Sequence, residues 1–362
     1  MAGMMENAFI NVKNRPRRSS TPGVQPSWSR RTRRSAGSSS GSPGRVGRDL
    51  VAHNKPEPGR RASQGDRMMS MPHSLSRKAV LVALVLMLAP VGPARGQELD
   101  GTLKKIKTSG TLALGYRESS PPFSFLGPDK RPVGYSIDLC LHVAAAIQKQ
   151  LGLADLKLTW VPVTPETRIP AVVRGTVDLE CGSTTASLSR QEQVDFSLMT
   201  FVDGGSLLTT AAGAPRGLGD LANRRIGVVP GTTTEKALAE FLAKEFVTVR
   251  KVPVKDHAEG LAALEARSID AYASDQGILV GLALTAGGPP GRFALVDVLF
   301  SYEPYGLMMR RNDSDFRLAV NRALADLYRS KQVSTIYDRW FSKFGRPNPA
   351  LQAMYFLNSL PE

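Results

Sequence analysis

The stretch RRIGVVPGTTTEKALAEFLAKEF, residues 224–246, decides the fold class. Its first half is a short apolar run that ends at Pro230 and Gly231, as expected of a buried strand. Its second half opens with Thr232 and, three residues later, Glu235, which is the capping-box pattern of a helix start, and apolar residues at helical spacing follow. A strand that runs directly into a helix indicates one unit of an α/β fold.

The same alternation extends on both sides of this stretch. Strands are predicted at 111–116, 156–163, 176–182 and 269–275, and helices at 99–110, 134–152, 164–175, 257–268 and, as a pair, 316–341. Gly110 is expected to stop the first helix, and Thr164 to open the third, with Pro165 in its first turn. The pattern predicts a mostly parallel sheet with helices on both faces, in which ligands bind beyond the carboxyl ends of the strands.

Polar side chains stand where these strands end. They are Arg117, Ser183 to Thr185, Thr232 to Thr234, and Asp275. Arg168 and Arg190 stand in the first turns of predicted helices, Arg190 after a Ser187 cap. The helix start at 231–233 also offers backbone N–H groups to an anion. A lone Arg most often forms a surface salt bridge. Several polar clusters at strand ends instead favour recognition of a charged ligand, although their positions in the sequence do not prove that they meet at one site.

Motifs for catalysis and cofactor binding are absent from the sequence. It contains no GxGxxG, phosphate loop, CxxC, GxSxG or HExxH, and no metal-ligand spacing, so we expect neither a metal nor a cofactor. From residue 97 onward the only histidines are His142 and His257. His142 falls in an apolar helix and is predicted to pack in the core. A Ser-His-Asp hydrolase could therefore use only His257, and no elbow motif supplies its serine.

The positive charge of the chain is concentrated at its start. The formal net charge of +15 includes 17 Lys+Arg against 4 Asp+Glu in residues 1–96, whereas residues 97–362 hold 30 against 28. The later part is nearly neutral, which argues against a nucleic-acid partner. Residues 1–67 contain only 8 Ile, Leu, Val, Phe or Trp, too few to form a core. Three interpretations remain: an untranslated stretch, a disordered leader, or a basic tail that binds nucleic acid or membrane.

Residues 68–96 have the three parts of an export signal. Arg77 and Lys78 precede the apolar run AVLVALVLMLAP at 79–90, and a small-x-small cleavage pattern at 94–96 would leave Gln97 first. The apolar run has about half the length that a membrane-spanning helix needs. We therefore expect a protein that is exported to the periplasm through a cleaved signal peptide.

Export affects the interpretation of the two cysteines, Cys140 and Cys181. In an oxidising compartment such a pair can form a disulfide, and closing a loop of roughly 40 residues would stabilise the fold by about 3–4 kcal/mol. Two buried free thiols are the equally weighted alternative.

Nine segments in order carry a resemblance to a known family. They are GYRESSPPFSF (115–125), VGYSIDL (133–139), RIPAVVRGTVDLECGSTT (168–185), SRQEQVDFS (189–197), PGTTTE (230–235), VKDHAEG (254–260), YASDQ (272–276), EPYGLMMRRND (303–313) and YDRWF (337–341). Together they resemble the periplasmic glutamate/aspartate-binding proteins of ABC importers, from about residue 100 to the C-terminus. The resemblance implies a monomer that works with an inner-membrane permease.

The same resemblance implies a two-lobed fold of type II with a hinge of two strands and the ligand in the cleft between the lobes. Lobe 1 would comprise 97–204 and 301–362, and lobe 2 would comprise 205–300. The chain would cross between them near 202–204 and 303–305.

The resemblance also implies a role for each site residue. Arg190 would pair with the α-carboxylate of the ligand, assisted by Ser183, Thr185 and Thr233. Asp275 would take the α-ammonium with help from Ser183, and Arg117, Arg168 and His257 would surround the side-chain carboxylate. Two departures from the family pattern are Pro165, where relatives carry a hydroxyl, and Tyr116, where they carry His.

The charges of these residues point to the same ligand class. Three Args against Asp275 alone form a surplus of cations, which asks for a ligand with a second anionic group. One alternative is a periplasmic dehydratase on the same fold, for which only Glu118 and Glu180 could serve as the general acid. Another is the input domain of a sensor, although no signalling domain follows within the sequence.

Overall fold

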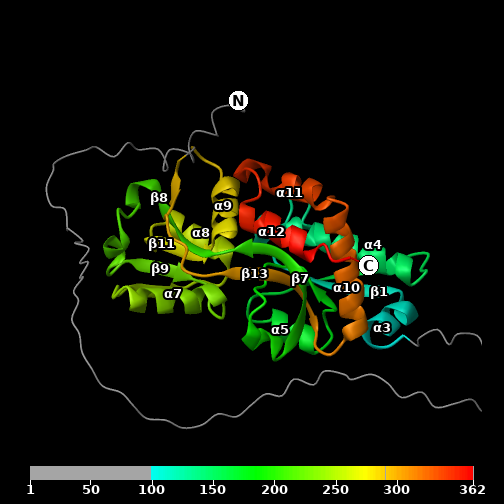
Figure 1. Cartoon of the computed structure of the whole chain (residues 1–362). Coiled ribbons are helices and arrows are strands. Elements are labelled where there is room, and N and C mark those ends of the chain that lie inside the picture. Colours follow the sequence, from blue (N-terminus) through cyan, green and yellow to red (C-terminus); the bar gives the residue numbers. More distant parts are fainter. Residues whose placement is uncertain (1–98, 290, 362) are drawn as a thin grey trace, which may run out of the picture. The chain divides into compact units, whose positions relative to one another are not determined.

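A computed structural model describes residues 99–289 and 291–361 and contains two five-stranded sheets with helices around them (Figure 1). The predicted extension at 1–67 and the predicted signal peptide at 68–96 lie outside the described residues, as does Gln97. Within the described part, none of the helices is long and apolar enough to cross a bilayer.

The first sheet has the strand order β5-β1-β6-β13-β7. Its strands are β5 Lys157–Pro162, β1 Thr111–Tyr116, β6 Leu179–Glu180, β13 Glu303–Arg310 and β7 Val194–Asp203. β1 pairs in parallel with β5 and β6, whereas β13 is antiparallel to both β6 and β7.

The second sheet has the order β10-β9-β11-β8-β12. Its strands are β10 Arg250–Pro253, β9 Arg225–Val228, β11 Ala271–Asp275, β8 Gly205–Thr210 and β12 Phe293–Leu295. β9 pairs in parallel with β10 and β11, and β8 is antiparallel to β11 and β12. Each sheet is thus mixed: one strand, β13 in the first sheet and β8 in the second, runs against the other four, so the prediction of mostly parallel strands holds for four of five strands in each sheet. The chain leaves the first sheet through β7, which runs into β8, and returns from β12 to β13, so β13 comes back antiparallel to β7.

The helices and the remaining strands complete the chain. The helices are α3 Gly101–Ser109, α4 Tyr135–Gln150, α5 Arg168–Val173, α6 Leu188–Gln191, α7 Thr233–Lys244, α8 His257–Glu265, α9 Gln276–Thr285, α10 Ser314–Arg329, α11 Val333–Phe341 and α12 Pro349–Asn358. A small antiparallel sheet is formed by β2 Ser119–Ser120, β3 Ser124–Leu126 and β4 Pro132–Val133. Short 3-10 turns lie at 211–213, 218–221 and 342–344.

Two local predictions about helix ends have opposite outcomes. Gly110 ends α3 in the left-handed conformation, as predicted (φ 63°). The helix expected to open at Thr164 begins instead at Arg168. Thr164 precedes Pro165, which disfavours helical backbone at that residue, and its N–H bonds to the Thr167 hydroxyl at 2.9 Å. A capped turn therefore replaces the first turn of the expected helix.

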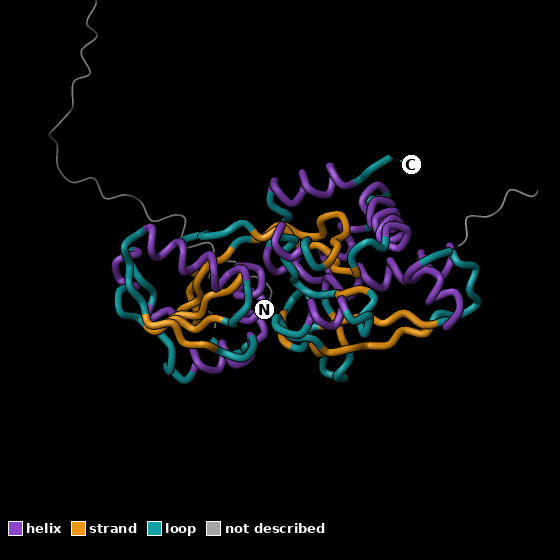
Figure 2. Tube along the Cα trace, turned by 90° about the horizontal axis from the view of Figure 1, so that it is seen from below, coloured by secondary structure: helices purple, strands orange, loops and turns teal. Residues whose placement is uncertain are grey.

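Helices cover both faces of the second sheet, as the alternation of its side chains shows. Leu207, Ala271 and Ala273 pack in one cluster with Leu238 of α7. Their neighbours Leu208 and Tyr272 point the other way, into a cluster that contains residues of α8 and α9. Figure 2 shows the strands of this sheet lying between helices.

The first sheet is covered in the same way. Met308 of β13 packs on the α5 side, whereas Leu307 and Met309 join the cluster formed with α4 and α10. An aromatic group fixes the strands that lead to the second sheet: the Phe123 ring lies 4.8 Å from Phe201 of β7 and 5.1 Å from Tyr305 of β13, centroid to centroid. In Figure 1, β7 and β13 extend from the first sheet toward the second.

Candidate ligand-binding site

A cavity lies between residues that follow strands of both sheets. Its lining comprises Arg117, Pro165, Arg168, Ser183, Thr185, Val229, Thr232 to Thr234, His257, Ala273 to Asp275, and Ile278. The space among them is about 370 Å³, including the part open to solvent.

Two arginines form one end of the cavity. Arg117 follows β1, and Arg168 is the first residue of α5; each is only 3% exposed. The guanidinium of Arg117 makes no hydrogen bond with any other described residue, and Nε of Arg168 is buried without a partner. Burial and the neighbouring Arg168 lower the pKa of Arg117 to about 10, so it stays charged near neutral pH. This end of the cavity presents buried cationic donors that the protein leaves unused.

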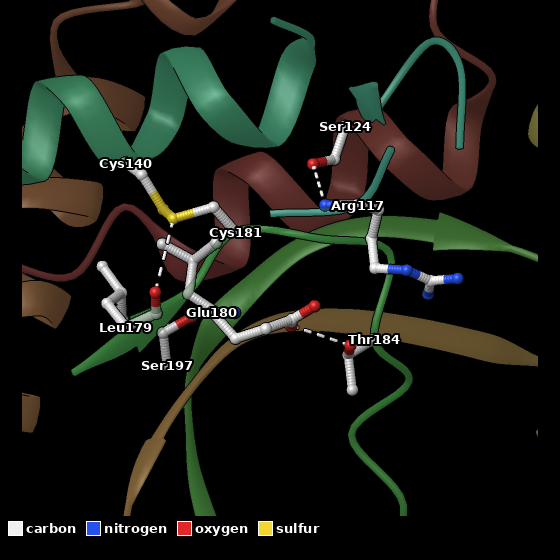
Figure 3. The surroundings of a disulfide bond; sticks show 9 residues. Arg117, Ser124, Cys140, Leu179, Glu180, Cys181, Thr184 and Ser197 are labelled. Carbon is white, nitrogen blue, oxygen red and sulfur yellow. Dashed lines mark hydrogen bonds between the residues drawn. A yellow bond between two sulfur atoms is a disulfide. The ribbon is translucent and has the colours of Figure 1, made fainter. Parts of the chain in front are cut away.

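Glu180 at the end of β6 lies behind these arginines. Arg168 donates to the Thr184 hydroxyl at 2.7 Å, and that hydroxyl donates to Glu180 at 2.8 Å (Figure 3). Gly182 is required here, because a Cβ at that position would lie 2.2 Å from a Glu180 oxygen and 3.1 Å from Arg117. The glycine lets a buried carboxylate sit close to two arginines. Glu180 therefore has a structural role toward Arg168, and it does not line the cavity.

His257 contributes a neutral ring to the same end. Its Nδ1 lies 2.6 Å from the Tyr272 hydroxyl, and the ring is buried. Burial, with Arg117 and Arg168 nearby, lowers the pKa of His257 to about 3. The imidazole therefore carries no charge at neutral pH.

Asp275 ends β11 at the other end of the cavity. It accepts a hydrogen bond from Thr234 at 2.6 Å and a very short one from Tyr305 of β13. Burial and the charge of nearby Glu303 raise the pKa of Asp275 to about 6. The carboxylate is held by Thr234 of α7 and Tyr305 of β13, and Asp275 lines the cavity.

Glu303 is a buried carboxylate that the predicted site did not include. It accepts from Thr233 at 2.6 Å, from Ser301 at 2.7 Å and, through a very short bond, from Thr185. Its signal in the sequence was an acidic residue at the start of the apolar strand EPYGLMM, which was interpreted only as a crossing point of the chain. Glu303, the first residue of β13, thus connects Thr185 to Thr233 at the start of α7.

Arg190 does not line the cavity, although it is buried beside it. Its backbone N–H is capped by Ser187, as predicted, and its guanidinium donates to the Thr185 carbonyl at 2.9 Å. Burial, together with the charge of Arg168, lowers its pKa to about 10. Of the eight predicted site residues, seven therefore line the cavity, and Arg190 is buried outside its lining.

The helix start at 231–233 is built differently from the prediction. Thr232 caps α7 by accepting from the Glu235 N–H at 3.1 Å. The Glu235 carboxylate accepts from the Gly231 N–H at 3.0 Å, so this donor is not available to an anion. The capping box that predicted the helix thus uses one of the N–H groups expected to bind ligand.

The disulfide expected as one of two alternatives is present. Cys140 of α4 is bonded to Cys181, which follows β6, and their Cα atoms are 6.1 Å apart (Figure 3). Neighbouring side chains of a strand point to opposite sides. Cys181 accordingly points toward α4, while Glu180 points toward Thr184. The disulfide therefore anchors the segment that carries Glu180 and Ser183.

The predicted surplus of cations needs a correction. The sequence argument counted Arg117, Arg168 and Arg190 against Asp275 alone. The structure adds Glu180 and Glu303, two buried carboxylates in the immediate surroundings. Net charge therefore no longer indicates the ligand, and the unused donors of Arg117 and Arg168 remain as the local indication. Among residues 99–289 and 291–361 there is no group of three His, Cys, Asp or Glu side chains that could hold a metal ion.

Comparison with known proteins identifies the family. The family model described as bacterial extracellular solute-binding proteins, family 3, matches residues 112–343. The chain belongs to this family. It is 39% identical to the L-glutamate/L-aspartate-binding protein of Pseudomonas aeruginosa, over 76% of this chain and 89% of the relative. It is also 35% identical to the glutamate/aspartate import solute-binding protein of Salmonella typhimurium, over 69% and 81% of the two chains.

A solved structure agrees with this assignment at the level of the fold. An ABC-transporter periplasmic binding protein from Brucella ovis, with glutathione bound, has a TM-score of 0.60 and 24% identity, over 73% of this chain and 81% of that one. The protein thus has the two-lobed α/β fold of an extracytoplasmic solute-binding protein. Its relatives are binding proteins, and they do not favour the dehydratase alternative.

Proposed function

We propose that the protein captures L-glutamate or L-aspartate between its lobes and delivers it to an ABC permease in the inner membrane. The names of the relatives in Pseudomonas aeruginosa and Salmonella typhimurium support this ligand class. The proposal includes export through a signal peptide at 68–96, a monomeric state, and lobes formed by 97–204 with 301–362 and by 205–300.

One observation carries the choice of an acidic ligand. Arg117 and Arg168 are buried at the cavity beside the neutral His257, and the Arg117 guanidinium and Nε of Arg168 lack partners among the described residues. An unpaired buried charge is costly, and a bound carboxylate would remove that cost through charge-assisted hydrogen bonds. This end of the cavity is the place for the side-chain carboxylate of the ligand.

The α-groups of the ligand belong at the other end. Asp275 offers the carboxylate for the α-ammonium, with Ser183 nearby in the lining. Arg190 has five N–H donors. The Thr185 carbonyl accepts from its Nη1 group, so the remaining donors can bind the α-carboxylate. A bound α-carboxylate would also compete with Glu303 for the hydroxyl protons of Thr185 and Thr233.

Calorimetric titration with the twenty amino acids tests the proposal. The exported protein would first be unfolded and refolded to remove any ligand acquired during growth. Glutamate and aspartate should bind, and glutamine, which has the shape of glutamate without its charge, should bind at least about 100-fold more weakly, or roughly 2.7 kcal/mol. Equal affinities for glutamine and glutamate would end the acidic-ligand proposal.

A further inference from the structure

Tyr272 and His257 form a buried pair at the acidic-ligand end of the cavity. The Tyr272 hydroxyl lies 2.6 Å from Nδ1 of His257, and Tyr272 is completely buried. The hydroxyl of Ser274 is the only other described group near this nitrogen, and it is 3.5 Å away. Nε2 of His257 makes no hydrogen bond with another described residue, and the ring lines the cavity.

The donors and acceptors of this pair fix the position of the histidine proton. A neutral imidazole has one N–H and one acceptor nitrogen. If Nδ1 carried the proton, it would donate to Tyr272, and the phenol proton would be left with the nearby Ser274 hydroxyl, with which Tyr272 makes no hydrogen bond of standard geometry. Buried polar hydrogens are almost always bonded, so the phenol donates to Nδ1. The imidazole proton then lies on Nε2.

The surroundings keep this arrangement in place. Gly260, one helical turn after His257 in α8, makes room for the phenol: a Cβ there would lie 2.3 Å from the Tyr272 ring. The charged and titratable groups around the imidazole are Arg117, Arg168, Tyr272 and, at the helix cap, Asp256. The two arginines oppose a positive charge on the ring, in agreement with its lowered pKa of about 3.

We propose that Tyr272 is a positioning residue that holds His257 in the tautomer with the proton on Nε2, so that the neutral ring always presents a donor to the ligand. The inference rests on the proposed function for the identity of that ligand, an acidic amino acid. It adds a determinant of specificity. An N–H donor beside two arginines can bind a carboxylate, whereas a ligand group that can only donate would find no acceptor there.

Nitrogen-15 NMR of the histidines tests the tautomer without any ligand. In the full-length protein labelled at histidine, His257 should show a protonated Nε2 and an unprotonated Nδ1, unchanged between pH 5 and pH 8. The Tyr272→Phe variant should lose this preference and show a mixture. A wild-type His257 with its proton on Nδ1 overturns the proposal.

A double-mutant cycle tests whether the tautomer matters for binding. Tyr272→Phe should weaken glutamate binding about 5–10-fold in the wild type. In the His257→Gln background, where the amide keeps an N–H donor and has no tautomers, the same change should cost less than about twofold. Equal losses in both backgrounds would show that Tyr272 acts only by packing and would refute the role. The matched control is Tyr337→Phe, which removes a hydroxyl group that donates to the Gly345 carbonyl and does not line the cavity.

The two measurements separate this inference from the proposed function. A protonated Nε2 in a protein that binds neither glutamate nor aspartate would refute the proposed function and leave the tautomer standing. A protonated Nδ1 in a protein that binds glutamate would do the reverse. If Tyr272→Phe does not fold, the wild-type spectrum still decides the tautomer.

Discussion

The two ends of the cavity handle buried charge in opposite ways. At one end, Arg117 and Arg168 keep donors that no described residue accepts. At the other end, Asp275 and Glu303 accept hydrogen bonds from hydroxyl groups, two on the first and three on the second. The carboxylates are held by the protein before any ligand binds, whereas the unpartnered donors of the two arginines are left for a ligand to engage. The predictions below are ordered from the largest effect to the smallest.

The largest effect is expected on the free energy of unfolding, when the disulfide is removed. Replacing both cysteines by serine opens a loop with a sequence separation of 41 residues and should lower the free energy of unfolding by about 4 kcal/mol. Urea denaturation of the exported wild-type and double-serine proteins measures the change. Alkylation of unreduced wild-type protein at both Cys140 and Cys181 would contradict the expectation.

The next effect breaks the arginine end itself. Arg168→Met replaces a buried cation by an uncharged, unbranched side chain. It should weaken glutamate binding by about 3 kcal/mol, or roughly 150-fold. The advantage of glutamate over glutamine should shrink, because glutamine does not use the charge. Arg174→Met, at the exposed end of the same helix, is the control and should leave both affinities unchanged. Equal losses of glutamate and glutamine binding would place Arg168 away from the side-chain carboxylate.

The smallest effect sharpens the carboxylate end through pH. An α-ammonium group binds the ionised form of Asp275, whose pKa is raised to about 6 by burial and by Glu303. Lowering the pH protonates Asp275 and removes the anion, so glutamate affinity should fall about tenfold from pH 7 to pH 5. Calorimetry across this range measures the change.

Asp275→Asn is the control for this titration. The variant should bind more weakly at pH 7 and show a much flatter profile. A wild-type affinity that is constant over the range would mean that Asp275 does not take the ammonium group.

The sequence was informative where one local signal sufficed. The Thr232 capping pattern and Gly110 predicted helix ends that the structure shows. The polar residues predicted at strand ends line one cavity, because parallel strands end at the same edge of a sheet. They are Arg117, Ser183, Thr185, Thr232 to Thr234, and Asp275. These features depend on a few neighbouring residues and not on contacts with distant parts of the chain.

The remainder depended on distant contacts. Glu303 is recognised as part of the site only when Thr185 and Thr233, which lie 118 and 70 residues from it in sequence, are seen to donate to its Oε2 oxygen. Arg190 was placed at the α-carboxylate by the family resemblance, and that role stays a prediction; the direction of its side chain, which donates to the Thr185 carbonyl, carries no signal in the local sequence. The antiparallel strands were missed because β7 and β13 are set by pairing across about 100 residues.

The order of the strands also bears on how the chain folds. All five strands of the second sheet come from one continuous stretch, from Gly205 to Leu295. The first sheet needs β13, which begins only at Glu303, between β6 and β7. Contacts of high sequence separation form slowly, and a chain made or exported from its N-terminus presents β13 late. We therefore expect the second sheet to assemble early and the first sheet, with its share of the cavity, to complete last.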